Sequence, residues 1–76
     1  MKRHPKNYER EIAKRFGLNL KTVIVATGIT QKKLARMSGL TEAALSLLLT
    51  GRREPMLSTV IKLQSVIPFE IEEMLK

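Results

Sequence analysis

The feature that most constrains this chain is a helical periodicity that is interrupted by glycines. Tyr8, Ile12 and Phe16 recur every four residues, which places them on one face of a helix. The β-branched cluster at residues 23–25 lies inside a longer segment with helical spacing. The pattern therefore predicts an all-α fold.

Capping residues divide the chain into a first helix and about five short helices that follow it. Thr30 and Thr41 are N-cap candidates, and Gly28, Gly39 and Gly51 stand where left-handed C-terminal residues are favoured. The first helix ends near Gly17. The predicted helices after it span residues 18 or 19 to 27, 31–38, 42–49, 57–66 and 71–75.

Length and composition exclude several classes of protein. A chain of 76 residues, 43% of them hydrophobic, builds a single modest core. Cysteine is absent and His4 is the only histidine, so disulfides, thiolate metal sites and sites with two imidazoles are excluded. No apolar run approaches the roughly 18 residues of a membrane span. The basic start, residues 1–6, lacks the apolar stretch of a secretory signal. We therefore predict a cytoplasmic protein without metal, cofactor or membrane contact.

The charge is unevenly distributed along the chain. Residues 1–16 contain six basic and two acidic side chains. Residues 17–53 contain six basic side chains and one acidic side chain, whereas residues 54–76 contain two basic and four acidic side chains. A basic front and an acidic end indicate a polyanionic partner on one side of the protein. The simpler interpretation is that the net charge of +7 only keeps the chain soluble.

The segment 30–48 gives the strongest indication of function. Two short helices meet at Gly39, and Ala35 stands where a large side chain would prevent their close crossing. The apolar positions between the helices are Leu34, Leu40, Leu45 and Leu48. This arrangement leaves one face of the second helix free to enter a duplex major groove.

With these residues the sequence resembles the lambda-repressor-like (Cro/XRE-type) helix-turn-helix family of bacteria and phages, over roughly residues 20–75. Gly28-Ile29-Thr30-Gln31 is similar to the Gly-Leu-Thr-Gln that opens the second helix of the family. Leu34-Ala35 resembles its buried pair, and Leu40-Thr41 the start of its recognition helix. The remaining similar positions are Leu20 and Val23, the loop Gly51-Arg52-Arg53 with Pro55, the positions Leu57, Val60, Ile61 and Leu63, and residues 71–75.

The resemblance implies both a fold and a function. The fold is a compact bundle of about five short helices, with a DNA-binding domain at 18–76 and a basic N-terminal arm or extra helix at 1–17. The function is that of a transcriptional regulator, a repressor of bacterial or prophage type, which binds a palindromic operator in double-stranded DNA as a homodimer. Such a protein is not an enzyme, and it is found in the cytoplasm at the nucleoid.

The sequence departs from the family at three places. Met56 replaces the usual Ser or Asn before the fourth helix, which weakens that N-cap. Pro68 replaces the usual Gly. The exposed positions of the recognition helix, where relatives often have Gln, Arg, Asn or Lys, are Glu42, Ala43, Ser46 and Leu47.

The candidate DNA contacts are Gln31, Lys32, Lys33, Arg36, Thr41, Glu42, Ala43, Ser46, Leu47, Arg52 and Arg53. Gln31, at a helix start, either binds a phosphate or is solvated, and Arg52 and Arg53 either meet the next phosphates or give solubility. The basic residues of the second helix are spread around it and cannot all face DNA. Glu42 either accepts a hydrogen bond from cytosine or only stabilises its own helix, because a negative charge near the N-terminus interacts favourably with the helix dipole. Leu47 is either an interface residue or, with Ala43, a reader of thymine methyl groups.

Both ends of the chain suggest further contacts. Lys2, Arg3 and Lys6 form either an arm that reaches the minor groove or a plain basic tail. The candidate dimer contacts are Phe69, Ile71, Met74 and Leu75, which otherwise complete the core of the monomer. The glutamates at 70, 72 and 73 have no nucleophile or metal partner nearby in the sequence, so catalysis is not expected.

Two other functions use the same fold. One is a protein-interaction module of the antitoxin or adaptor kind, in which the face around Leu47 meets a protein partner. It predicts purification with a stoichiometric partner and no specific operator. The other is a nonspecific nucleic-acid binder, which predicts equal affinity for unrelated duplexes.

Overall fold

The computed structural model describes residues 5–76, with side chains from Glu9 onward. The described residues form five helices and no strand: α1 (Pro5–Thr27), α2 (Gln31–Ser38), α3 (Glu42–Leu49), α4 (Leu57–Gln64) and α5 (Ile71–Met74). The prediction of an all-α bundle is therefore confirmed. Lys2 and Arg3, and the side chain of Lys6, lie outside the described residues, so the basic arm stays a prediction.

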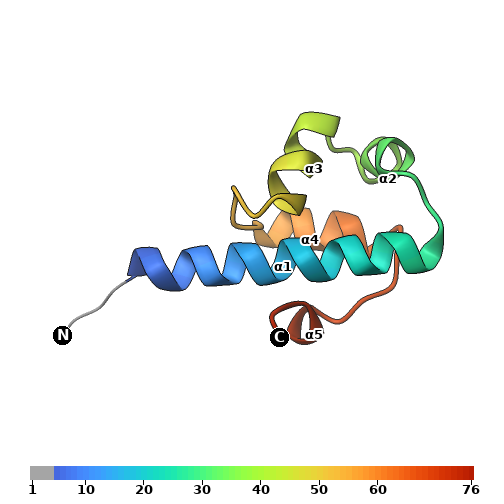
Figure 1. Cartoon of the computed structure of the whole chain (residues 1–76). Coiled ribbons are helices and arrows are strands. Elements are labelled where there is room, and N and C mark those ends of the chain that lie inside the picture. Colours follow the sequence, from blue (N-terminus) through green and yellow to red (C-terminus); the bar gives the residue numbers. More distant parts are fainter. Residues whose placement is uncertain (1–4) are drawn as a thin grey trace.

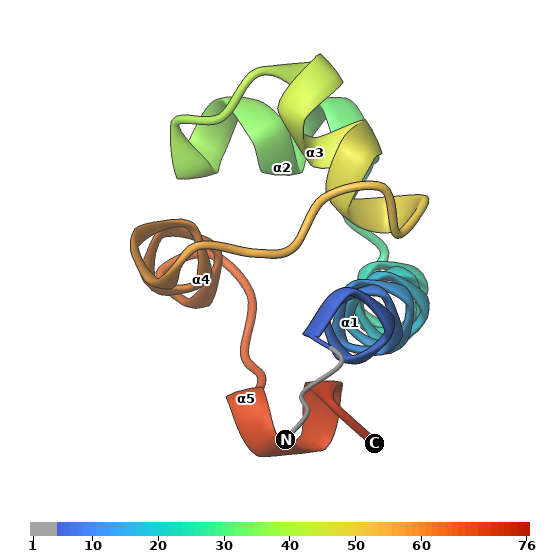
Figure 2. The same cartoon turned by 90° about the vertical axis from the view of Figure 1, so that its left-hand side faces the viewer.

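The helices are arranged around α1, which is much the longest. Figures 1 and 2 show α2 and α3 on one side of α1, α4 beside it, and α5 on the side opposite α2 and α3. The molecule measures 43 × 22 × 19 Å. It is elongated because the first turns of α1 project beyond the other helices (Figure 1).

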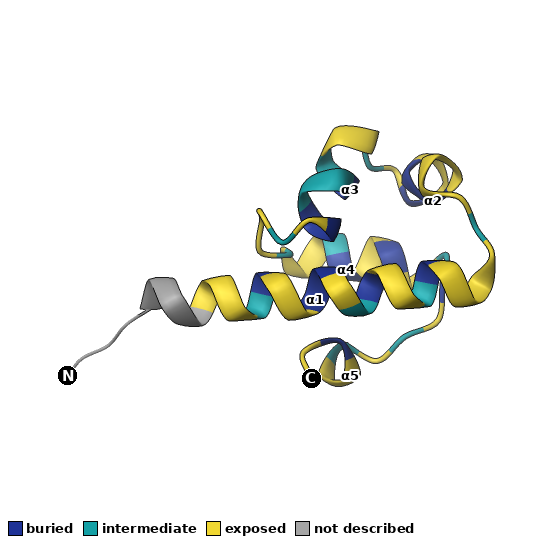
Figure 3. Ribbon diagram, viewed as in Figure 1, coloured by how far each residue is buried: buried dark blue, intermediate teal, exposed yellow. Residues whose placement is uncertain are grey.

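One core joins all five helices. Its fully buried large side chains are Phe16, Leu20, Leu34, Leu45, Leu63 and Met74. On α1 the buried positions follow helical spacing, so that a single stripe of the helix faces the bundle (Figure 3). Burial of large apolar side chains supplies most of the stabilisation, at about 1.5–3 kcal/mol each.

The predicted helix end at Gly17 is wrong, because α1 continues through this residue for a further ten positions to Thr27. Gly17 is buried, and a Cβ placed on it would lie 2.5 Å from the carbonyl oxygen of Leu48 and 2.9 Å from that of Leu49. The glycine therefore allows the end of α3 to approach α1 and does not end the helix. Where the DNA-binding domain begins within α1 stays a prediction.

The predicted limits of the shorter helices are close to the observed ones. Gly28, Gly39 and Gly51 have φ values of 76°, 78° and 74°, the left-handed conformation expected of them. Met56 forms no side-chain hydrogen bond to the start of α4, in agreement with the weak cap expected there. α4 ends two residues earlier than predicted, at Gln64.

Candidate nucleic-acid interface

Two capped helices and a glycine turn form the centre of the candidate interface. The hydroxyl of Thr30 accepts a hydrogen bond from the N–H of Lys33 at 3.1 Å, and that of Thr41 accepts one from the N–H of Ala44 at 3.0 Å. Between the helices Gly39 is left-handed, and the N–H of Leu40 donates to the oxygen of Ala35 at 2.8 Å. Both N-cap predictions and the predicted turn are confirmed.

Small and apolar residues fix how α2 packs on α3. Leu34 and Ala35 are almost fully buried, and Leu45 of α3 is buried with them. Ser38 is the one buried polar side chain of the described residues, and its hydroxyl donates to the oxygen of Leu34 at 2.7 Å. Because that hydroxyl is satisfied, it adds no desolvation penalty to the crossing.

The opposite side of α3 remains accessible. Glu42 and Ala43 are exposed, while Ser46 and Leu47 are half-buried. Thr50, which follows α3, is exposed and lies seven positions after Ala43, on the same face of the helix. Sequence reasoning missed Thr50 as a site residue, although this i, i+7 spacing was visible in the sequence.

The chemistry of this face suits only a few base contacts. Glu42 offers a carboxylate acceptor, and Ser46 offers a hydroxyl. The hydroxyl of Thr50 donates to the backbone oxygen of Ser46 at 2.9 Å and keeps its acceptor capacity. Ala43 and Leu47 offer methyl groups, whose counterpart in the major groove is the C5-methyl of thymine.

The polar residues of α2 point to different sides of the helix. Gln31 is exposed at its first position, where unpaired N–H groups favour an anion. Lys33 lines a hollow with Met37, Val66 and residues of the α1–α2 loop, toward the link between α4 and α5. Lys32 and Arg36 are exposed and one turn apart, and Arg36 is also three positions after Lys33, so it lies between the two lysines on the helix surface. The three basic residues therefore share one broad side of α2, with Lys33 at the edge that faces the hollow.

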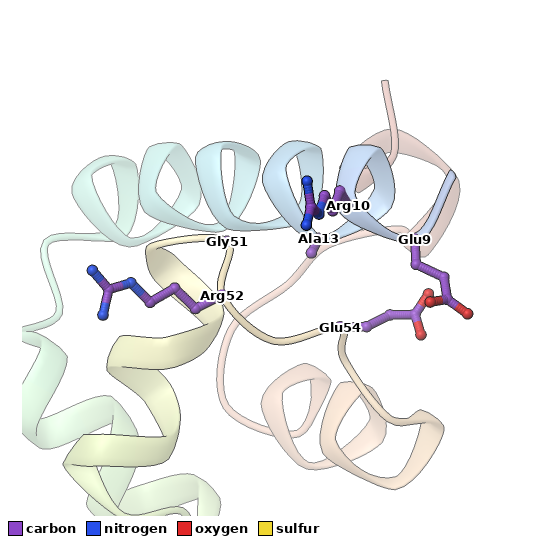
Figure 4. A pocket seen from close by; sticks show the side chains of 6 residues that line it. All are labelled: Glu9, Arg10, Ala13, Gly51, Arg52 and Glu54. Carbon is purple, nitrogen blue, oxygen red and sulfur yellow. The ribbon is translucent and has the colours of Figure 1, made fainter. Parts of the chain in front are cut away.

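The two arginines after α3 also diverge. Arg52 lines a hollow with Arg10 and Ala13 of α1 (Figure 4). Arg53 lines a smaller hollow between α3 and the start of α4. A single phosphate is therefore not placed to meet both side chains.

Nine of the eleven sequence-predicted DNA contacts are exposed, and the other two, Ser46 and Leu47, are half-buried. The exposed ones are Gln31, Lys32, Lys33, Arg36, Thr41, Glu42, Ala43, Arg52 and Arg53. In the part of the chain that the structure describes, the ion pairs are Arg15–Glu11 and Lys76–Glu73, so none of the predicted contacts takes part in one.

The structure corrects one of the dimer contacts predicted among the C-terminal residues. Met74 is 2% exposed and belongs to the core, so it is not available as a dimer contact. Phe69 is half-buried, and its ring packs edge-on against that of Phe16 with centroids 6.2 Å apart. The side-chain amide of Asn19 also donates to the oxygen of Met74 at 2.8 Å. Leu75, at 36% exposure, and Ile71, which is half-buried and packs against the core, are the candidates that remain open.

Residues 5–76 contain neither a cluster of metal-ligating side chains nor a helix that could span a membrane. No three His, Cys, Asp or Glu side chains of this part gather as metal ligands would. None of its helices combines the length and the apolar character needed to cross a bilayer.

A comparison with known protein families connects this geometry to a class of proteins. A family model described as helix-turn-helix matches residues 20–74, which include most of α1 after Gly17 and all of α2 to α5. No curated protein matches the chain.

Proposed function

The chain belongs to the lambda-repressor-like (Cro/XRE-type) helix-turn-helix family of DNA-binding regulators, and on this premise we propose that it is a sequence-specific transcriptional regulator of bacterial or phage type. In the proposed mode of binding, a homodimer places the two copies of α3 in successive major grooves of a palindromic operator, about 34 Å apart. The protein acts in the cytoplasm at the nucleoid, as a repressor.

One observation carries the proposal: α3 is fixed to the bundle on one side and accessible on the other. Leu45, Leu48 and Leu49 are buried against the core, whereas Glu42 and Ala43 are exposed at the end that Thr41 caps. A helix held in this way can enter a major groove without unfolding or moving, which keeps the entropic cost of binding low.

Affinity comes chiefly from phosphates. Residues 1–53 carry twelve basic and three acidic side chains, a net charge of +9. Neutralising about five phosphates gives a plot of log K against log salt with a slope near −4 to −5. Gln31 at the start of α2 and Arg52 after α3 are the proposed contacts on either side of the groove.

Specificity comes from the accessible face of α3. Ala43 and the exposed part of Leu47 contact thymine methyl groups, while Glu42 or Ser46 accepts one hydrogen bond, for example from cytosine N4. Because a buried methyl contributes about 0.8 kcal/mol, two such contacts per half-site discriminate roughly tenfold or more.

The dimer contact is proposed at Leu75 and Ile71, the two candidates without an aromatic partner or full burial. Leu75→Asp tests this contact, because its side chain is exposed enough for the monomer to keep its fold. The expected result is a lower mass in solution and weaker operator binding. A wild-type protein that is monomeric both free and on DNA contradicts the homodimer.

The deciding experiment is selection of bound sequences from random duplex DNA, followed by replacement of each operator thymine by uracil. We expect uracil to weaken binding at one or two positions, and Leu47→Ala to abolish the loss at those positions. No enriched sequence, with equal affinity for all duplexes, favours a nonspecific binder. No duplex binding, with a stoichiometric protein partner held through Leu47, favours an interaction module.

A further inference from the structure

α1 is longer than the family match requires. The match begins at residue 20, whereas the helix begins at Pro5, so about four turns precede the matched region. Within these turns Arg10 and Lys14 are exposed and one turn apart, which puts both on one side of the helix, about 6 Å apart along its axis. The function of this basic side is not explained by the contacts proposed above.

The loop after α3 lies directly on this side of α1. A Cβ placed on Gly51 would lie 3.1 Å from the Cα of Lys14 and 3.3 Å from its Cγ. The loop is also tied to α3, because the N–H of Gly51 donates to the oxygen of Leu48 at 3.2 Å and that of Arg52 to the oxygen of Leu47 at 2.9 Å. The end of α3, the loop and the early turns of α1 therefore form one connected surface.

A hollow of about 310 Å³ opens between the loop and α1, lined by Glu9, Arg10, Ala13, Gly51, Arg52 and Glu54. Figure 4 shows the guanidinium group of Arg10 beside Ala13 and Gly51, and the carboxylates of Glu9 and Glu54 turned toward each other at the opposite end. The hollow therefore has a basic end, next to α3, and an acidic end, next to α4.

The two sides of α1 differ in how their charges are compensated. Arg15 forms an ion pair with Glu11 at 3.3 Å, and both line a hollow with Leu75, toward α5. Arg10, Lys14 and Arg52 form no ion pair with any described residue. Arg10 and Lys14 thus lie beside the loop that carries Arg52, whose side chain extends away from Arg10 (Figure 4).

From this arrangement we propose that Arg10 and Lys14 of α1 join Arg52 in a second phosphate-binding surface, which holds the DNA strand bordering the groove that α3 occupies. The ligand is the phosphodiester backbone of duplex DNA, and the inference rests on the proposed function. The acidic pair Glu9 and Glu54 repels phosphates and so limits the surface on the side of α4. Contacts to phosphates raise affinity for every sequence alike and do not select among sequences.

The test compares wild type with Arg10→Gln/Lys14→Gln on the selected operator and on a shuffled duplex, between 50 and 200 mM salt. Each lost phosphate contact reduces the slope of log K against log salt by about 0.9, so the double variant loses about 1.8. At 0.1 M salt the same relation gives about 8-fold per contact, or up to roughly 60-fold weaker binding to both duplexes. The ratio of the two affinities stays unchanged.

Two variants serve as matched controls. Arg15→Gln removes one positive charge from the other side of α1, and it should leave the slope within about 0.3 of wild type because that arginine lies away from the strand. Glu54→Gln removes repulsion at the acidic end and should strengthen binding to both duplexes about equally. Thermal melts of all variants should agree, since the changed side chains are exposed.

The possible failures are distinguishable. A wild-type slope near zero overturns the proposed function and this inference with it. A normal wild-type slope that is unchanged in Arg10→Gln/Lys14→Gln overturns this inference alone. A double variant whose slope is unchanged but whose affinity ratio falls also overturns it, because these side chains would then support base selection.

Discussion

Replacing Gly17 by Ala tests how α3 is attached to the bundle. In the interior of a helix, alanine is favoured over glycine by about 0.8–1.0 kcal/mol, so the change would ordinarily stabilise α1. At this position, however, the new Cβ would lie 2.5 Å from the carbonyl oxygen of Leu48. The obstacle is backbone, which cannot rotate away, so α1 and the end of α3 must move apart.

The balance of these two effects gives the expected magnitude. Overpacking a core contact costs about 1–3 kcal/mol. Because two backbone oxygens obstruct the new Cβ, the cost should lie in the upper part of this range, at about 2–3 kcal/mol. After the gain in helix propensity is subtracted, we expect Gly17→Ala to reduce the free energy of unfolding by about 1–2 kcal/mol. For a domain of this size each 1 kcal/mol lowers Tm by about 4–8 °C, so Tm should fall by roughly 5–15 °C.

Thermal and urea unfolding followed by circular dichroism measure this change. Thr22→Ala is the matched control, because Thr22 is exposed on α1 and alanine there gains helix propensity without a clash. It should raise the stability by a few tenths of a kcal/mol. If Gly17→Ala melts at or above the wild-type temperature, the close approach of α3 to α1 is refuted, and the argument for a rigidly held recognition helix is refuted with it.

Three further substitutions test the caps and the core. Thr41→Ala removes the acceptor of the hydrogen bond from the Ala44 N–H and should lower the free energy of unfolding by about 1 kcal/mol, measured by urea unfolding. An unchanged midpoint of the urea transition contradicts the role of Thr41 as a cap. Met56→Ser supplies the side-chain cap that α4 lacks and should raise the free energy of unfolding by about 1 kcal/mol. A Tm below that of wild type contradicts the inference that the start of α4 is uncapped. Met74→Ala creates a cavity in the core and should cost about 2–5 kcal/mol; a change in molecular mass without loss of stability would instead place Met74 in an interface.

The parts of the fold that could be predicted from the sequence depend on neighbouring residues in the chain. Thr30 and Thr41 cap helices through bonds that span three residues, and Gly39 ends α2 through its own φ. Such interactions need no knowledge of the rest of the molecule. The helix-turn-helix could therefore be predicted almost to the residue.

The parts that could not be predicted depend on contacts between distant segments. Gly17 stands within a helix because α3, about 30 residues later, packs on it, and nothing near Gly17 in the sequence shows this. Met74 likewise belongs to the same core cluster as Phe16, and its backbone oxygen accepts a hydrogen bond from Asn19, although both residues belong to the other end of the chain. The relation of Arg10 to Arg52 is of the same kind.

The composition of α3 explains why affinity and specificity should reside on different elements. Three of its eight residues are buried leucines, and its only charged residue is the acidic Glu42, so α3 supplies no positive charge for phosphates. Positive charge must come from the surrounding elements, namely α2, the loop after α3 and the early turns of α1. Substitutions on α3 should therefore change which sequences are bound and leave the salt dependence as it is. Substitutions of the surrounding basic residues should do the reverse, because phosphates are the same at every base pair.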